Sequence, residues 1–276
     1  MKHNTVLSHQ RVVFIGAGNM AEALVKGLVE SRRLPRGGMR VTDLRPERLA
    51  YFEKTYRVGS LPSNTEAAEW ATILVLAVKP QTFPDVLAEL KPAFRRETLA
   101  VSIAAGIPTA RIEQALGGEA RVVRVMPNTP ALVRAGVSGL CAGRWATAAD
   151  LKKAEAIMGS VGLAVRVEEK LMDSITAVSG SGPAYVFYLA EAMLEAAEKL
   201  GLARDMARTL VAGTLDGAAK LLGASADGPD VLRARVTSRG GTTEAAIRVL
   251  DERRVRAALV EAMSAAHRRA GELSGG

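Results

Sequence analysis

Two glycine-rich stretches hold the residues whose types and spacing are best suited to chemistry. The first, Gly16–Ala21, reads Gly-Ala-Gly-Asn-Met-Ala and lies between an apolar run and a helix-forming run. This strand–turn–helix context is that of a dinucleotide-binding fingerprint, in which Gly16 allows a sharp turn, Gly18 lets the backbone approach a pyrophosphate and Ala21 keeps the helix close to the strand. The helix start adds unpaired N–H groups and a positive dipole end. We therefore predict an NAD or NADP site; the alternative is an ordinary βα turn.

The second stretch, Val236–Thr243, lies between two predicted helical segments and contains Ser-Arg-Gly-Gly-Thr-Thr. Successive backbone N–H groups at a helix start form a nest for an anion, and a carboxylate suits it well. Alternatively, Thr242 or Thr243 caps the following helix. A cap needs only one hydroxyl, so the whole pattern favours a site for an anionic ligand.

Two further candidate side chains follow predicted strands. Asp43 ends the strand Met39–Thr42, close to the distance from the fingerprint at which a ribose-binding acid is expected. A turn or a helix cap accounts for this aspartate equally well. Lys79 follows Ile73–Val78, the most strand-like run of the chain. Because ligands bind at the carboxyl edge of a parallel sheet, Lys79 is a candidate contact for cofactor or substrate.

The elements that position these residues alternate between strand and helix up to Val167 and are helical afterwards. This order predicts the α/β class, with a doubly wound, mostly parallel sheet. We expect a Rossmann-type domain over residues 1–168 and an all-helical dimerisation domain over residues 169–276. The expected strands are Arg11–Ile15, Met39–Thr42, Ile73–Val78, Leu99–Ala104, Arg121–Val125, Val137–Ala142 and Ala164–Val167. The helices expected after them are Lys170–Val178, Pro183–Leu200, Ala203–Leu222, Pro229–Val236, Thr243–Asp251 and Arg253–Ala270.

The predicted helix Pro183–Leu200 is apolar on most of its faces. A helix of this kind is buried or lies in a subunit contact, which favours a homodimer formed through the helical domain. Its two carboxylates, Glu191 and Glu195, are spaced like a catalytic pair. An exposed helical stripe is the better interpretation of that spacing.

The overall composition is that of an ordinary globular protein, with 48% apolar and 24% charged residues among 276. No run reaches the ~20 apolar residues that a membrane span needs, so we expect no membrane partner. The polar segment Met1–Arg11 lacks the apolar core of a secretory signal. Cys141 is the single cysteine, and we expect it to be a small core residue in a cytoplasmic protein.

The net charge of +8 is scattered along the chain, with no long basic run. We therefore expect a solvated surface and no nucleic-acid partner. The three histidines lie at positions 3, 9 and 267 and do not form a metal-binding set. We accordingly predict no metal.

Taken together, the motifs resemble the pyrroline-5-carboxylate reductase family. Each motif alone is weak evidence, but they occur in the family's order and cover nearly the whole chain. The matching stretches are Phe14–Ala21, Ala77–Pro80, Val101–Gly106, Arg124–Pro130, Ser179–Tyr185 and Ser238–Thr243.

The resemblance implies an NAD(P)H-dependent enzyme that reduces a small cyclic imine to proline, built as a dimer and often as a ring of dimers. It implies that the substrate contacts Ser238, Gly240, Gly241, Thr242 and Thr243, with Thr243 near the ring nitrogen. From the fingerprint and the resemblance together, the expected cofactor contacts are Ile15, Gly16, Ala17, Gly18, Asn19, Met20, Asp43, Arg45, Asn64, Ala77, Lys79 and Ala105.

The choice between the two cofactors is open at this point. Asp43 favours the free 2′-hydroxyl of NADH. Arg45, two residues later, is suited to the 2′-phosphate of NADPH. The chain also departs from the family, with Arg239 where proline is usual and Ala234 where an acid is common. Arg239 adds a cation beside the proposed carboxylate nest, which either tightens binding or marks a changed substrate.

Hydride transfer from nicotinamide C4 to C5 of the imine is the chemistry that we expect. Because the imine must be protonated to be a good hydride acceptor, we expect that the protein need not supply a strong catalytic acid and mainly positions the reactants. One alternative is a related imine or β-hydroxyacid dehydrogenase, a class that generally uses a lysine between the domains. Lys170 is the lysine near the predicted boundary, and it lacks the surrounding pattern of that class. The other alternative is a nucleotide-sensing Rossmann protein without enzymatic activity.

Overall fold

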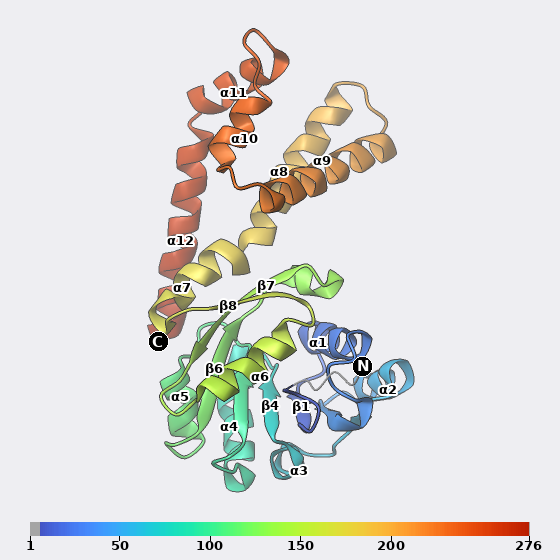
Figure 1. The fold of residues 1–276 in the computed structure, drawn as a ribbon, viewed down its shortest axis with the longest axis vertical. Helices are drawn as coiled ribbons and strands as arrows, with labels where there is room; N and C mark the ends of the chain where they lie inside the picture. Colours follow the sequence, from blue (N-terminus) through green and yellow to red (C-terminus); the bar gives the residue numbers. More distant parts are fainter. Residues whose placement is uncertain (1–5, 276) are drawn as a thin grey trace. The chain divides into compact units, whose positions relative to one another are not determined.

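The computed structural model describes residues 6–275 (Figure 1). His3 and the rest of the first five residues, like residue 276, lie outside the described part. The chain divides into two compact units, which are considered separately below. The first contains residues 6–181 and 266–275, and the second contains residues 182–265.

An eight-stranded sheet forms the centre of the first unit, in the order β3-β2-β1-β4-β5-β6-β7-β8. Every neighbouring pair is parallel except β6 and β7, which are antiparallel. The predicted Rossmann-type, mostly parallel sheet followed by a helical region is confirmed. The strands are β1 Val12–Ile15, β2 Met39–Thr42, β3 Gly59–Ser60, β4 Ile73–Leu76, β5 Leu99–Ser102, β6 Arg121–Met126, β7 Gly136–Ala142 and β8 Gly162–Arg166.

Strand β1 lies between β2 and β4, with Ile15 in register with Thr42 on one side and Leu76 on the other. All its residues are buried, because both faces of the sheet are covered. Phe14 belongs to the apolar cluster of one face, and Val13 and Ile15 belong to that of the other. The strand order reverses between β1 and β4, and ligands of open α/β sheets bind at the carboxyl ends of such strands.

The helices of the first unit cover both faces of this sheet (Figure 1). Residues of α1 (Asn19–Glu30), α2 (Pro46–Tyr56) and α6 (Ala148–Met158) pack in one apolar cluster. Residues of α3 (Asn64–Trp70), α4 (Phe83–Leu90) and α5 (Thr109–Ala115) pack in the other. Short 3-10 helices connect these elements: η1 Arg36–Gly38, η2 Pro80–Thr82, η3 Lys91–Ala93, η4 Thr129–Val133 and η5 Glu169–Leu171.

Several predicted boundaries differ from the structure. Strands β4 and β5 each end two residues earlier than predicted, because the chain leaves the sheet there to form loops at the carboxyl edge. The two-residue strand β3 was not expected. The predicted helix Lys170–Val178 is wrong as a single α-helix. The chain instead forms η5, then α7 (Met172–Ile175), then a π-helical turn at Thr176–Gly180.

The second unit is helical, as predicted, and consists of α8 (Gly182–Lys199), α9 (Arg204–Ala224), α10 (Pro229–Arg235), α11 (Thr242–Glu252) and the first part of α12 (Val255–Gly275). Helices α8 and α9 pack against each other. Many apolar side chains here are exposed, among them Phe187 and Tyr188. Glu195 forms an exposed ion pair with Lys199 at 2.5 Å, so this carboxylate belongs to a solvated stripe.

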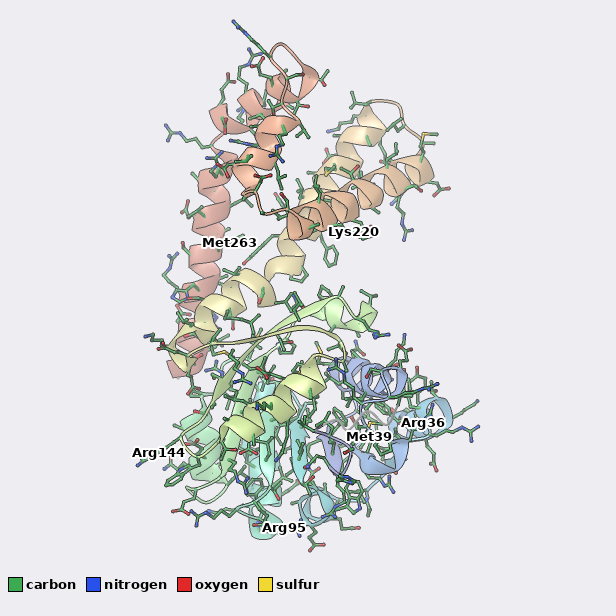
Figure 2. All side chains as sticks on the ribbon, viewed as in Figure 1. Arg36, Met39, Arg95, Arg144, Lys220 and Met263 are labelled. Carbon is green, nitrogen blue, oxygen red and sulfur yellow. The ribbon has the colours of Figure 1, made fainter. Side chains whose placement is uncertain are left out.

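Basic side chains are distributed over separate elements. Arg36, Arg95 and Lys220 lie on η1, on the segment before β5 and on α9 (Figure 2). Cys141 is buried in β7 as expected, and burial raises the pKa of its thiol to about 12. Among residues 6–275, no helix is both long and apolar enough to cross a membrane.

Candidate functional site

The turn after β1 has the geometry that its glycines predict. Gly16 has φ +95°, and a Cβ on it would lie 3.0 Å from the carbonyl oxygen of Ala77, so a larger residue is excluded by both conformation and space. Gly18 caps the start of α1. A Cβ on Gly18 would meet no described heavy atom within 4 Å, so this stretch of backbone is open to a ligand. The first N–H groups of α1 have no intrahelical acceptor and are suited to phosphate oxygens.

The peptide groups on either side of Ala17 are held by two side chains. The Ala17 N–H donates to Asp43 Oδ2 at 2.8 Å, and Arg48 Nε donates to the Ala17 carbonyl oxygen at 2.8 Å. Ala17 itself is fully buried. The glycine turn is thus fixed by tertiary contacts as well as by its own sequence.

Arg48 is in turn anchored by Glu22 on α1. Arg48 Nη2 lies 2.7 Å from Glu22 Oε2, and Glu22 Oε1 accepts the hydroxyls of Tyr51 and Tyr56, each at 2.9 Å. Burial alone raises the pKa of Glu22, but the hydrogen bonds from Arg48 and the two tyrosines outweigh it and hold this pKa below its usual value. This support between α1 and α2 was missed in the sequence, where nothing local marks it.

Asp43 and Arg45 form a close ion pair at the end of β2. Asp43 Oδ1 accepts the backbone N–H of Arg45 at 3.0 Å and its Nε at 2.9 Å, and Oδ2 accepts Arg45 Nη2 at 3.1 Å. With the Ala17 bond, four donors surround the carboxylate. Burial alone raises the pKa of Asp43, but hydrogen bonds from Arg45 and Ala17 lower it overall. The Asp43 side chain is 10% exposed and that of Arg45 is 54% exposed.

The remaining predicted cofactor residues lie on loops, or at the start of a helix, at the same sheet edge. Asn64 Oδ1 accepts the Thr42 hydroxyl at 2.8 Å, and its Nδ2 donates to Glu89 at 2.7 Å. Lys79 is exposed at the start of η2. Ala105 lies in the loop between β5 and α5. The loops after β1, β2, β4 and β5, together with the first residues of α1 and α3, therefore hold the predicted cofactor contacts that follow Ile15, all within the first unit.

The Ser238–Thr243 stretch forms the turn before α11, in the second unit. Helix α11 begins at Thr242, and its N-cap is Gly241, so the interpretation of Thr242 or Thr243 as the cap is wrong. The Gly241 N–H donates to the Ser238 carbonyl oxygen at 3.0 Å. The backbone N–H groups of the first helical residues have no intrahelical acceptor, as an anion nest requires.

A carboxylate of the chain itself already contacts this turn. The Gly240 N–H donates to Glu244 Oε2 at 2.7 Å. The bond resembles the reciprocal part of a capping box, in which an acidic residue of the first turn accepts a backbone N–H from before the helix. Glu244 was not singled out in the sequence, although an acid three residues after a helix N-cap is a recognisable signal.

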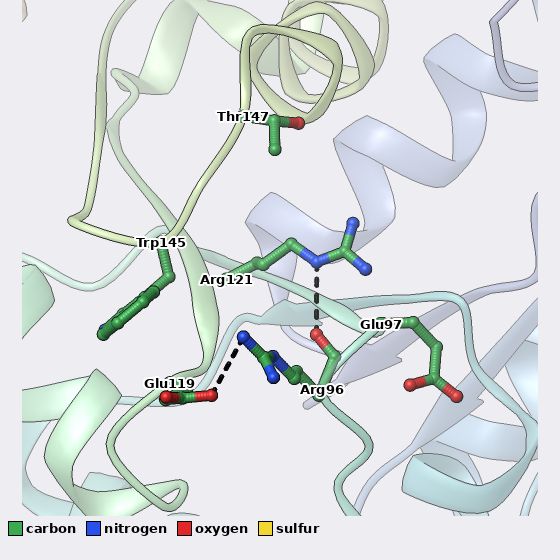
Figure 3. A pocket seen from close by; sticks show the side chains of 6 residues that line it. All are labelled: Arg96, Glu97, Glu119, Arg121, Trp145 and Thr147. Carbon is green, nitrogen blue, oxygen red and sulfur yellow. Dashed lines mark hydrogen bonds and ion pairs between the residues drawn. The ribbon is translucent and has the colours of Figure 1, made fainter.

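A hollow of about 250 Å³ lies at the opposite, amino edge of the sheet. Arg96 and Glu97 precede β5, and Glu119 and Arg121 lie at the start of β6 (Figure 3). Two of its charged groups pair with each other, Arg96 with Glu119 at 3.1 Å, and Arg121 Nε donates to the Arg96 carbonyl oxygen at 3.1 Å. The position and these pairings separate this hollow from the predicted cofactor site.

Comparison with protein families divides the chain between two models. One described as "Pyrroline-5-carboxylate reductase dimerisation" matches residues 169–273, and one described as "NADP oxidoreductase coenzyme F420-dependent" matches residues 11–106.

Relatives that align with nearly the whole chain are pyrroline-5-carboxylate reductases, in agreement with the first of these models. The pyrroline-5-carboxylate reductase of Pseudomonas aeruginosa is 44% identical over 97% of this chain and 98% of its own. The solved pyrroline-5-carboxylate reductase of Coxiella burnetii is 41% identical, with a TM-score of 0.90 over 96% of this chain and 98% of that one. The Plasmodium falciparum pyrroline carboxylate reductase, solved with NADP bound, is 29% identical, with a TM-score of 0.88 over 97% and 99%. The chain belongs to the pyrroline-5-carboxylate reductase family.

Proposed function

We propose that this protein reduces 1-pyrroline-5-carboxylate to L-proline, the last step of proline biosynthesis, with NADPH or NADH as hydride donor. The observation that carries the proposal is near-complete coverage by pyrroline-5-carboxylate reductases such as the Pseudomonas aeruginosa enzyme, which is 44% identical to this chain. The open backbone at Gly18, placed where the strand order reverses, supports a dinucleotide on this chain.

A nicotinamide dinucleotide fits the residues of the first unit. The cofactor, when bound, supplies the hydride from C4 of its reduced ring. The turn Gly16–Gly18 and the start of α1 provide N–H groups and space for the pyrophosphate. Ala77, Lys79 and Ala105 lie on loops, and Asn64 lies at the start of α3, and these elements would surround the rest of the cofactor.

The ion pair at the end of β2 favours NADPH over NADH. A free carboxylate at position 43 would accept the ribose 2′-hydroxyl and repel a 2′-phosphate. Here the acceptor positions of Asp43 are taken by Ala17 and Arg45, and its charge is compensated. The half-exposed guanidinium of Arg45 is then the group that meets the 2′ position, and it matches a phosphate in charge and geometry.

In the second unit, the backbone N–H groups at the start of α11 would hold the substrate carboxylate, with hydrogen bonds from Ser238, Thr242 and Thr243. Thr243 would place its hydroxyl on the ring nitrogen. Since the imine accepts hydride in its protonated form and the protein need not supply a strong catalytic acid, positioning of C5 is the main task of these residues.

The related-dehydrogenase alternative requires a catalytic lysine between the domains. Lys170 instead forms an ion pair with Glu168 at 2.7 Å, and both side chains are more than two thirds exposed. This exposed pair does not provide a buried catalytic ammonium, so the reductase is the better proposal.

We also propose a domain boundary at residues 168 and 169 and a homodimer formed through the helical domain. The dimerisation family model begins at residue 169, which supports both statements. Exposed apolar side chains on α8, including Phe187 and Tyr188, are the kind of surface that a second copy covers. Assembly of dimers into a ring is the further step implied by the family resemblance. Light scattering after size-exclusion chromatography tests the dimer and the ring of dimers, and a monomer would contradict both assemblies.

Initial rates of cofactor oxidation test the reaction. We expect rapid turnover of pyrroline-5-carboxylate with NADPH and much slower turnover of the six-membered piperideine analogue. Binding of NADPH without turnover of the five-membered imine would contradict the proposal and would favour a changed substrate or a sensor.

A further inference from the structure

The last turn of α12 packs against the loop that joins β5 to α5, and both belong to the first unit. Gly106 in this loop is buried and has φ +73°. A Cβ on Gly106 would lie 3.1 Å from both the Cβ and the carbonyl oxygen of Leu273. The loop therefore passes the C-terminal turn so closely that a side chain at position 106 would require the loop or the turn to shift.

A hydrogen bond anchors the same turn to α7. Ser274 Oγ donates to Asp173 Oδ1 at 2.9 Å, across 101 residues of sequence. The same carboxylate oxygen lies 3.9 Å from Arg124 Nη2 on β6. The Arg124 side chain is 5% exposed, and a buried cation needs its anionic partners in place. Asp173 is thus held from two sides.

Arg124 also connects to the far end of the loop. Its Nη1 lies 3.4 Å from Glu169 Oε1. That oxygen accepts the Thr109 N–H at 2.8 Å, and Glu169 Oε2 accepts the Thr109 hydroxyl at 2.6 Å. Thr109 is the first residue of α5. Residues 103–108, which have no helix or strand of their own, are therefore held at Gly106 by α12 and at their end by Glu169.

We propose that the last turn of α12, residues 271–275, positions the loop 103–108 for the nicotinamide cofactor, with Ser274 and Asp173 as positioning residues. The inference rests on the proposed function, because it takes Ala105 in this loop as a cofactor contact. Leu273 is half exposed and Ser274 lies outside the apolar core clusters. Loosening the turn therefore frees the loop while the core of the first unit stays packed.

The test uses the full chain and measures NADPH affinity directly, by fluorescence titration without any imine. We expect Ser274→Ala to weaken NADPH binding roughly three- to tenfold, as loss of about one hydrogen bond predicts. The KM for NADPH should rise by the same factor while kcat at saturating NADPH stays within about twofold. Ser274→Thr, which keeps the hydroxyl, should restore the affinity.

Ser264→Ala is the matched control, because the Ser264 hydroxyl donates to the Val260 carbonyl oxygen within α12. It should leave NADPH binding unchanged. Asp173→Asn provides a second variant and should weaken NADPH binding in the same direction as Ser274→Ala. Unchanged NADPH affinity in both variants, with lowered thermal stability alone, would overturn the proposal and leave the turn a purely structural contact. A wild-type protein that binds NADPH but reduces no imine would instead contradict the proposed function. The comparison of NADPH affinities between wild type and variants would still stand.

Discussion

The backbone N–H of Ala17 donates to Asp43 Oδ2 at 2.8 Å, joining the glycine turn after β1 to the end of β2. The aspartate that was predicted to bind a ribose hydroxyl thus holds in place the turn that we propose to bind the pyrophosphate. Because Arg45 occupies the other acceptor positions of Asp43, we propose that the Arg45 guanidinium determines the choice between NADPH and NADH.

Replacing Arg45 should change the cofactor preference. We expect Arg45→Gln to lower the ratio of kcat/KM for NADPH to that for NADH by about ten- to a hundredfold, since a charge-assisted, two-pronged contact with phosphate is lost. Steady-state kinetics with both cofactors measures this ratio. Lys54→Gln removes an exposed cation elsewhere on α2 and should leave the ratio unchanged.

Asp43→Asn distinguishes the two roles of the acid. If Asp43 holds the glycine turn in place, this variant weakens the binding of NADPH and the binding of NADH to the same extent. A selective loss of NADH activity would show that Asp43 binds the ribose after all.

Thr243 is the side chain whose removal should affect substrate turnover most directly. We expect Thr243→Ala to lower kcat/KM for the imine roughly ten- to a hundredfold, the cost of about one or two hydrogen bonds, with little change in NADPH affinity. Thr243→Ser should recover most of the loss. Thr209→Ala, at an exposed hydroxyl bonded within α9, is the control. Unchanged kinetics in Thr243→Ala would remove this residue from the site.

Glu244 places a negative charge next to the proposed carboxylate nest. Glu244→Gln keeps an oxygen for the Gly240 N–H but removes the charge, so we expect KM for the anionic imine to fall by about two- to fivefold. Progress curves at several imine concentrations measure the change. The effect should weaken at high salt, and a rise in KM would mean that the carboxylate organises the turn for binding.

Acid should weaken the cap of α6. Thr147 and Asp150 form a capping box, and Lys153 lies 3.2 Å from the fully buried Asp150 carboxylate. Burial alone raises the pKa of Asp150, but hydrogen bonds from Thr147 and Lys153 lower it overall. The carboxylate therefore stabilises the fold above the unfolded pKa of about 3.9, and this contribution is lost as pH falls through the folded pKa.

Asp150→Asn should accordingly reduce the free energy of unfolding by about 1–2 kcal/mol near pH 7. The difference from wild type should shrink as pH falls below about 4. Denaturant titrations across that range measure it, and a difference that stays constant with pH would contradict the role of the charge.

The sheet and its ligand edge were predictable because their signals are local. The buried run before Gly16 and the glycines themselves place β1, the turn and α1 almost to the residue. The ends of β4 and β5 were predicted too late, since Val78 and Ala104 are apolar but belong to loops. Hydrophobicity alone does not show where a buried strand ends and an apolar loop begins.

The contacts that fix the site were not predictable, because they join residues distant in sequence. Nothing near Arg48 indicates that it reaches the carbonyl of Ala17, and nothing near Ser274 indicates Asp173. Asp43 could be placed at the edge of the sheet, but the donors that surround it depend on the packing of β1 against β2. Sequence patterns identify candidate ligand contacts more readily than they identify the distant residues that fix those contacts in position.

Transfer of isotope from cofactor to product tests the central claim most directly. NADPH carrying deuterium at both positions of C4 should yield proline with deuterium at C5, in proportion to the cofactor oxidised, when it is incubated with the protein and pyrroline-5-carboxylate. The position of the label can be read by NMR of the isolated proline. Cofactor oxidation without labelled proline, or no oxidation by a protein that binds NADPH, would contradict the account.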